Sequence, residues 1–329
     1  MLSEAVLAPI ASHLTKKRLL IVADGALQLL PFAALPNPNT IANATPRQLM
    51  IESHELTSLP SASVLVLQRK ELAERKSAPY AIAVIADPVF GRNDERTNDS
   101  RKEKKIDQLT KSDVNSEFNS DRLTRALGDL GLNSIGEIRR LPFAGREASS
   151  ILKMVPRDQS FSAIGFKANR TTLMNPRLAQ YRMIHLATHG VMDPKNPELS
   201  GILLSMLDEN GKEQNGYVGL SEIYNLNLPA ELVVLSACET GTGKLIRGEG
   251  LIALTRGFMY AGAERLVASL WRVDDQATAL LMASFYEQML VNKLKPAAAL
   301  REAQRQLSRQ TQWKKPHYWA GFVIQGEWR

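Results

Sequence analysis

The chain contains a single cysteine, Cys238, at which an apolar run that begins at Leu232 stops abruptly. Such a run predicts a short buried strand, and the glycines at 241 and 243 predict that the chain turns after it. A thiol is a strong nucleophile near neutral pH only as the thiolate, and a neighbouring imidazole can take its proton. We therefore look for a histidine in a matching position.

His189 stands in that position, because a second run of the same kind, which begins at Tyr181, ends on it and Gly190 follows. Ligands of open α/β sheets bind at the carboxyl ends of strands, so His189 and Cys238 would share one cleft edge if the two strands are neighbours. One imidazole and one thiol are enough for acyl transfer. The alternative is that Cys238 is a small buried residue and His189 a hydrogen-bonded residue at the end of a strand.

Acyl transfer also needs hydrogen-bond donors for the oxyanion of the tetrahedral intermediate, and backbone N–H groups in a tight turn can supply them. Gly190 and the backbone amide of Cys238 are the candidates for this oxyanion hole. His185 is a competing base. It lies four residues back along a strand, about 13 Å from His189, and its apolar neighbours predict a buried structural role.

Metal and nucleotide sites are not expected. No pair of histidines or carboxylates has the spacing of a zinc site, so the sequence predicts no metal and no cofactor. Residues 241–244 read Gly-Thr-Gly-Lys, which is similar to part of a phosphate-binding loop. A Walker A motif requires a glycine where Cys238 stands and a serine or threonine where Leu245 stands, so this interpretation fails.

The pattern of apolar residues predicts an α/β fold. Apolar runs predict strands over 18–23, 81–88, 160–165, 265–271 and 316–324, and amphipathic patterns predict helices over 145–152, 250–260, 276–290 and 296–307. Asn210-Gly211, between two apolar runs, predicts a β-hairpin. Strand and helix alternate from 181 to 271, which is typical of a mostly parallel central sheet with helices on its faces.

The domain organisation follows from a change in composition. Residues 91–120 are charged and polar with almost no aliphatic side chains, and they predict a disordered insertion in an N-terminal part, 1–140, ahead of a catalytic core, 141–329. A nucleic-acid-binding arm is the alternative, and the mixed signs of its charges argue against it.

Composition limits the class of protein. No apolar run approaches the length needed to cross a bilayer, and the N-terminal segment carries an early acid and no basic region, so we expect neither a membrane span nor a secretory signal. A lone cysteine fits a reducing compartment, so we expect a cytoplasmic location. The net charge is +7, but bases are scattered among acids. We expect a solvated surface or a dock for an acidic partner, with no nucleic acid bound directly.

Four motifs occur together in order along the chain. They are LATHG at 186–190, LSACETG at 235–241, GEG at 248–250 and ASLWRVDD at 268–275. With PFAAL at 31–35 and PHYWAGF at 316–322, they resemble the CHAT domain, a caspase-like cysteine peptidase family of clan CD that is often attached to tetratricopeptide repeats. The resemblance extends over nearly the whole chain and implies one domain, 1–329, with a caspase-hemoglobinase-like αβα sandwich.

The resemblance also implies roles for individual residues. His189 would be the general base and Cys238 the nucleophile, as in separases and caspases, and their separation, 238 − 189 = 49 residues, is close to the ~50 of the caspase signature. The LWRVDD stretch is similar to the separase segment whose aspartate lines the S1 pocket, which implies Asp275, or its neighbour Asp274, for that role. The alternative is that these aspartates cap a helix that begins near Gln276.

Two functions remain open. The first is a cysteine endopeptidase that cleaves a protein substrate after Arg or Lys, because an acidic S1 pocket would select a cation. Glu239 stands where caspases have Arg, Gln or Gly, which argues against cleavage after Asp. No tetratricopeptide repeats precede the domain in this sequence, so either a separate regulatory protein would gate it or the chain is part of a longer protein. The second is a catalytically silent interaction module with the same fold.

Overall fold

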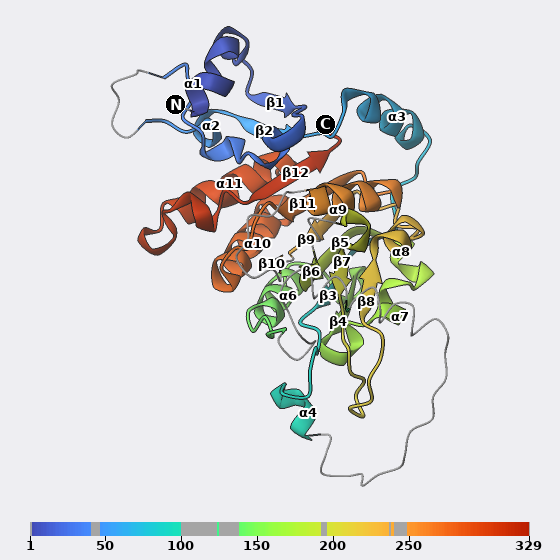
Figure 1. Ribbon diagram of the computed structural model, residues 1–329. Helices are drawn as coiled ribbons and strands as arrows, with labels where there is room; N and C mark the ends of the chain where they lie inside the picture. The colour runs from blue at the N-terminus through green and yellow to red at the C-terminus, as the bar shows by residue number, and fades with distance from the viewer. Residues whose placement is uncertain are drawn as a thin grey trace. The chain divides into compact units, whose positions relative to one another are not determined.

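The computed structural model describes residues 2–40, 47–99, 124, 138–191, 196–236, 238–239 and 249–328. The chain forms two compact units. The first unit combines Met1–Lys76 with Val267–Arg329, and the second is Ser77–Leu266. Strand β11, Arg265–Ser269, contains the division between them. Both units contain parallel strands and helices, drawn in Figure 1.

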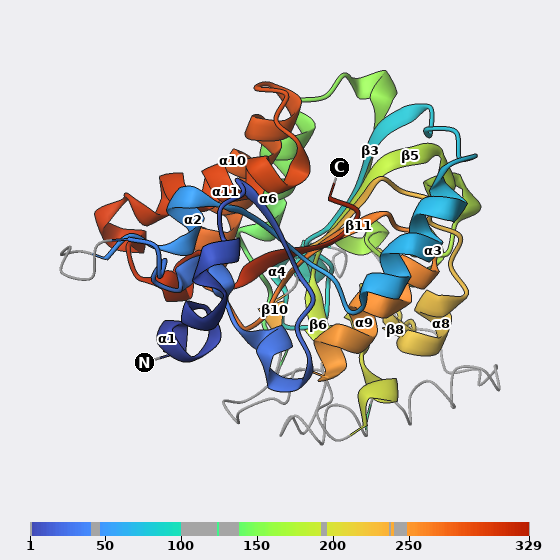
Figure 2. The same ribbon diagram turned by 90° about the horizontal axis from the view of Figure 1, so that it is seen from above.

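The second unit is built on a parallel sheet with the strand order β9-β5-β3-β4. Its strands are β3 (Tyr80–Ala86), β4 (Ser160–Ile164), β5 (Tyr181–Ala187) and β9 (Leu232–Leu235). The small and β-branched side chains from Ile82 to Ala86 are fully buried, as expected for a sheet covered on both faces. β3 and β5 lie side by side through most of their length in Figure 2.

Short helices surround this sheet. They are α4 (Glu95–Asp99), α6 (Ala144–Leu152), η6 (Arg157–Gln159), η7 (Gly165–Lys167), α7 (Arg170–Leu173), η8 (Pro176–Gln180), η9 (Pro197–Leu199), α8 (Leu220–Tyr224) and α9 (Glu249–Tyr260). The spacing of Ala144, Ala148 and Ile151 gives α6 one apolar face, which it packs against β3, β4 and β5. Asn169 caps α7 through its side chain, as its type and position suggest.

A second, smaller sheet lies at the carboxyl ends of the large strands, with the order β10-β6-β7-β8. It contains β6 (His189–Val191), β7 (Gly201–Leu203), β8 (Tyr217–Gly219) and β10 (Cys238–Glu239). β7 and β8 pair in antiparallel fashion, so the hairpin predicted from Asn210-Gly211 is confirmed. Gly211 has a φ of 76°, a left-handed conformation that favours glycine.

The first unit contains a three-stranded parallel sheet in the order β1-β2-β12, packed with helices. Its elements are α1 (Leu2–Val6), η1 (Ala8–His13), β1 (Arg18–Ile21), η2 (Gly25–Leu29), η3 (Phe32–Ala34), α2 (Met50–Ser53), β2 (Glu55–Ser58), α3 (Ala62–Leu72), α10 (Asp275–Leu290), α11 (Pro296–Ser308), η10 (Thr311–Trp313), η11 (Pro316–Tyr318) and β12 (Phe322–Gly326). The last strand starts later than the predicted residue 316. The amides of Trp319 and Ala320 bond back to the carbonyl of Pro316, which turns the chain first.

Part of the predicted insertion, 91–120, is folded. Residues 91–99 form a turn and α4, because the Arg96 side chain bonds to the carbonyls of Asp87 and Pro88 and to the carboxylate of Asp94. The rest of that stretch lies outside the described residues, as do 241–244. The predicted α/β class with a mostly parallel sheet is confirmed. In the described part of the chain, no helix is long and apolar enough to cross a membrane.

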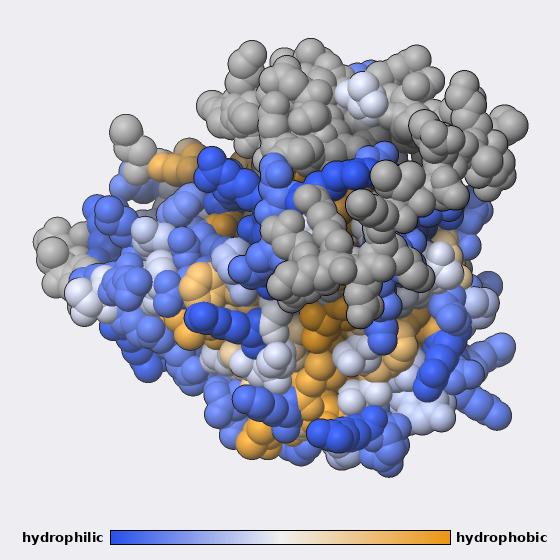
Figure 3. Space-filling view, turned by 90° about the horizontal axis from the view of Figure 1, so that it is seen from below, coloured by the Kyte–Doolittle hydropathy of each residue, from blue (hydrophilic) through white to orange (hydrophobic). Residues whose placement is uncertain are grey.

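The surface of the described residues is mainly hydrophilic on the face shown in Figure 3, with hydrophobic side chains gathered in a narrow band. Charged residues of both signs account for 23% of the sequence, which explains why blue side chains cover so much of this face.

Candidate active site

One parallel register connects the two sheets of the second unit. In the large sheet, Met183 pairs with Leu232 and Leu186 with Leu235. In the small sheet, His189 pairs with Cys238. The offset is the same in both, 232 − 183 = 49 and 238 − 189 = 49. The two strand pairs therefore leave the large sheet together, and the Cα atoms of His189 and Cys238 are neighbours across the ladder, about 4.8 Å apart.

This pair lies where a ligand would be expected. β5 ends at Ala187 and β9 at Leu235, so His189 and Cys238 follow the carboxyl ends of adjacent parallel strands. The condition for a shared cleft edge, that the two strands are neighbours, is met. Gly190, the other candidate for the oxyanion hole, pairs with Glu239 on one side and Ile202 on the other.

A backbone carbonyl and an aromatic ring contact the imidazole of His189. Its Nε2 lies 2.6 Å from the carbonyl oxygen of Arg139, and its ring centroid lies 5.1 Å from that of Phe90. The backbone of His189 pairs with Leu203 on the neighbouring strand β7. The carbonyl of Leu203 also accepts a hydrogen bond from the Thr188 hydroxyl. Because a carbonyl oxygen can only accept, Nε2 carries the proton of this hydrogen bond. In the neutral ring Nδ1 is then the basic nitrogen.

A cluster of charged side chains lies at the carboxyl end of β3. Arg140 donates from Nε and Nη2 to the two carboxylate oxygens of Asp87, both at 2.9 Å, and from Nη1 to Glu95 at 2.6 Å. Arg96 lies 3.1 Å from Asp87 and binds Asp94 with two nitrogens. Hydrogen bonding to Asp87 raises the pKa of Arg140. Burial by itself would raise the pKa of Asp94, but the hydrogen bonds from Arg96 outweigh it and lower that pKa.

His185 has a different environment. It lies in the middle of β5, fully buried, with Nε2 2.7 Å from a carboxylate oxygen of Glu147 on α6. The predicted buried structural position of His185 is confirmed. Its contact joins the sheet to α6 and lies within the core of the second unit.

The two aspartates predicted for an S1 pocket lie at the start of α10, in the first unit. Asp274 is the N-cap, and its side chain accepts a hydrogen bond from the amide of Ala277 at 3.0 Å. Asp275 is the first residue of the helix. The capping alternative therefore describes Asp274 correctly, and a substrate-binding role for either residue stays a proposal.

A family model described as the CHAT domain matches residues 1–327. The chain belongs to the CHAT family. The predicted caspase-like fold has a solved counterpart in separase from the Saccharomyces cerevisiae separase–securin complex, which matches with a TM-score of 0.51 and 13% identity over 93% of this chain and 15% of that one. A structure of the Arg-specific cysteine proteinase gingipain R matches with a TM-score of 0.49 and 10% identity, over 99% of this chain and 67% of that one.

This CHAT domain also has curated relatives. Tetratricopeptide repeat protein 28 of Homo sapiens is 25% identical over 97% of the chain, and the protein of that name in Mus musculus is 36% identical over 32% of it. The chain spans 12% of the human protein's length and 4% of the mouse protein's length.

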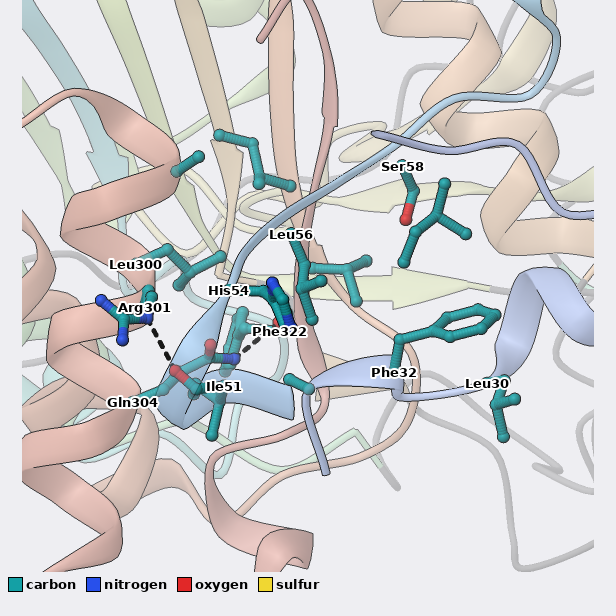
Figure 4. A pocket seen from close by; sticks show the side chains of 15 residues that line it. Leu30, Phe32, Ile51, His54, Leu56, Ser58, Leu300, Arg301, Gln304 and Phe322 are labelled. Atoms are coloured by element: carbon teal, nitrogen blue, oxygen red, sulfur yellow. Dashed lines mark hydrogen bonds between the residues drawn. The ribbon is translucent and has the colours of Figure 1, made fainter. Parts of the chain in front are cut away.

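The first unit of the CHAT domain has a small hollow of about 30 Å³, shown in Figure 4, between its sheet and α11. The polar side chains of α11 that line it form hydrogen bonds to backbone carbonyls of neighbouring segments. Arg301 donates to the carbonyls of Ile51 and Glu52, and Gln304 donates to the carbonyls of Trp319 and Phe322. The hollow is thus a feature of packing. Among the described residues no group of three or more His, Cys, Asp or Glu side chains could hold a metal ion.

Two features of the site were not predicted. The carbonyl of Arg139 is a backbone group, and no side-chain pattern indicates it. The second feature is Ser236, which stands two residues before Cys238 and has no sequence pattern that indicates a role. Its side chain is 3% exposed, and its hydroxyl has no hydrogen-bond partner among the described residues.

We predict that Ser236→Ala leaves the free energy of unfolding unchanged or raises it by about 0.5–1 kcal/mol, because the substitution removes a buried hydroxyl that makes no hydrogen bond. Ser205→Ala is the matched control. The Ser205 hydroxyl is equally buried but donates to the carbonyl of Gly165 and accepts from the amide of Val89. That variant should lose about 1–3 kcal/mol in urea unfolding. Equal losses in both variants would contradict the assignment of Ser236.

Proposed function

We propose that this CHAT domain is a cysteine endopeptidase in which His189 is the general base and Cys238 the nucleophile. One observation carries the proposal, namely the register that pairs these two residues at the carboxyl ends of adjacent strands. The hydrogen bond from His189 Nε2 to the carbonyl of Arg139 supports it, because in that tautomer of the neutral ring Nδ1 is the basic nitrogen.

The proposed reaction is acyl transfer in two steps. Nδ1 takes the thiol proton, and the thiolate attacks the carbonyl carbon of the scissile peptide bond, whose oxygen becomes an oxyanion. The imidazolium returns the proton to the leaving amine as the C–N bond breaks, which leaves a thioester. Water then attacks the thioester while the imidazole accepts its proton, and the thiolate is released. The amides of Gly190 and Cys238 are the proposed donors to the oxyanion.

For the substrate, we propose a protein cleaved after Arg or Lys, with Asp275 as the S1 carboxylate and Asp274 as the alternative. The support is the position of both residues in the LWRVDD motif, together with the acidic start of α10.

We also propose that a partner gates the activity. The matching human and mouse proteins are named for tetratricopeptide repeats, and the matching separase is in complex with securin. A tetratricopeptide repeat region, in the same chain or in a separate one, is the proposed regulator. The lone cysteine supports a reducing, cytoplasmic setting, where the thiol stays free.

Cys238→Ala and His189→Ala should each abolish cleavage of a peptide library, since each removes one member of the dyad. His13→Ala, an exposed histidine on η1, is the matched control and should cleave as the wild type does. Cleavage is measured by mass spectrometry of the products. Turnover by Cys238→Ala at the wild-type rate would contradict the peptidase proposal and favour an interaction module.

Asp275→Ala should lower kcat/KM for peptides with Arg or Lys before the scissile bond about 30-fold or more, because a desolvated carboxylate partner of the substrate cation is worth about 2 kcal/mol or more. Asp274→Ala tests the alternative: if Asp274 is an N-cap alone, its loss should lower the free energy of unfolding by about 1 kcal/mol and leave kcat/KM for Arg peptides unchanged, whereas a fall in kcat/KM would assign the S1 role to Asp274. Kinetics on matched Arg and Ala peptides separate the two effects. If Asp275→Ala cleaves Arg peptides as the wild type does, its S1 role is wrong.

A further inference from the structure

The strand end that carries His189 is also joined to Arg140. The amide of Asp87 donates to the carbonyl of Ala187 at 3.1 Å, two residues before His189. The carboxylate of Asp87 binds both Nε and Nη2 of Arg140. The residue before Arg140 is Arg139, whose carbonyl accepts the hydrogen bond from His189. These contacts connect the end of β5 to the imidazole of His189 through Asp87, Arg140 and the carbonyl of Arg139.

The segment that carries the Arg139 carbonyl is fixed on both sides of it. On one side, Ile138 is 8% exposed and belongs to the apolar cluster that contains Phe90 and Val191. On the other side, Arg140 forms its two-pronged bond with Asp87. A bidentate pair of this kind fixes orientation as well as distance. The carbonyl between the two anchors is thereby aimed at the imidazole.

The backbone at Asp87 is strained in a way that serves this geometry. Asp87 has a φ of 51°, a left-handed conformation that costs a residue other than glycine about 1–3 kcal/mol. Arg96 holds it there by donating to its carbonyl at 2.8 Å. Gly145 leaves room, because a Cβ at that position would lie 3.1 Å from the Asp87 carboxylate. The Asp87 carboxylate is thus held where the Arg140 guanidinium donates two hydrogen bonds to it.

We propose that Arg140 is a positioning residue for the catalytic histidine, and that it acts by aiming the carbonyl of Arg139 at His189 Nε2. This inference rests on the proposed dyad. A carbonyl that accepts from Nε2–H stabilises the imidazolium, and so favours the state in which the thiol proton has moved to His189. Loss of the Arg140–Asp87 contact releases the carbonyl, and the thiolate then forms only at higher pH.

The test uses the pH dependence of alkylation of Cys238 by iodoacetamide, followed by intact mass on the full chain. The chain has one cysteine, so every alkylation event reports on Cys238. Arg140→Gln should move the midpoint of the rate against pH upward by about one unit, towards the value of an ordinary thiol near 8.5. Arg140→Lys keeps the charge but cannot bridge both oxygens, and its midpoint should lie between those of the wild type and Arg140→Gln.

Two controls separate positioning from a loss of stability. Arg96→Gln removes the other guanidinium from the same carboxylate; it should lower Tm, and it should move the midpoint less than Arg140→Gln does, because the bidentate Arg140–Asp87 contact remains. Arg92→Gln removes an exposed ion pair with Glu213 and should change neither quantity. Equal midpoint shifts in Arg96→Gln and Arg140→Gln would overturn the proposal, since they would indicate a general loosening of the cluster.

His189→Ala distinguishes a failure of this inference from a failure of the dyad. If His189→Ala raises the midpoint but Arg140→Gln does not, the dyad stands and the role of Arg140 is wrong. If His189→Ala does not move the midpoint, His189 does not activate the thiol, and both proposals fail.

Discussion

The parallel pairing of β5 with β9 is the interaction on which the proposed chemistry depends. Main-chain hydrogen bonds hold the two strands in one register while both lie in the core, and the same offset continues after they leave the large sheet. A slip of one residue would turn every side chain of one strand to the opposite face. Both strands are buried on both faces, and close packing of their side chains against fixed neighbours opposes such a slip, so packing in the core also sets which residue faces His189 across the small sheet.

Elements outside the large sheet then refine the position of the imidazole. The β7 strand pairs with β6 on its far edge, Phe90 packs against the ring, and the 138–140 segment supplies the acceptor for Nε2. These groups come from distant parts of the chain. The charged cluster around Asp87 links two of them, since it contacts the end of β5 through its backbone and the 138–140 segment through Arg140.

The sequence predicted the large-scale features because each had a local cause. Continuous apolar runs indicated β3, β5 and β9, and Asn210-Gly211 indicated the hairpin. The roles of the network behind His189 could not be read in the same way. The acceptor for Nε2 is a backbone carbonyl, and Arg140 meets Asp87 over 53 residues of sequence. The folded turn at 91–99 was missed because Arg96 orders it through contacts that composition does not reveal.

The most direct test of the central claim is a disulfide trap at the shared register. A cysteine introduced by His189→Cys would have its Cα about 4.8 Å from that of Cys238, within the range of a disulfide. Val191→Cys, two residues along the same strand, would lie about 8 Å away and outside that range. Mild oxidation followed by peptide mapping should give an intramolecular disulfide in the first variant and none in the second. No disulfide in His189→Cys, or equal yields in the two variants, would contradict the account.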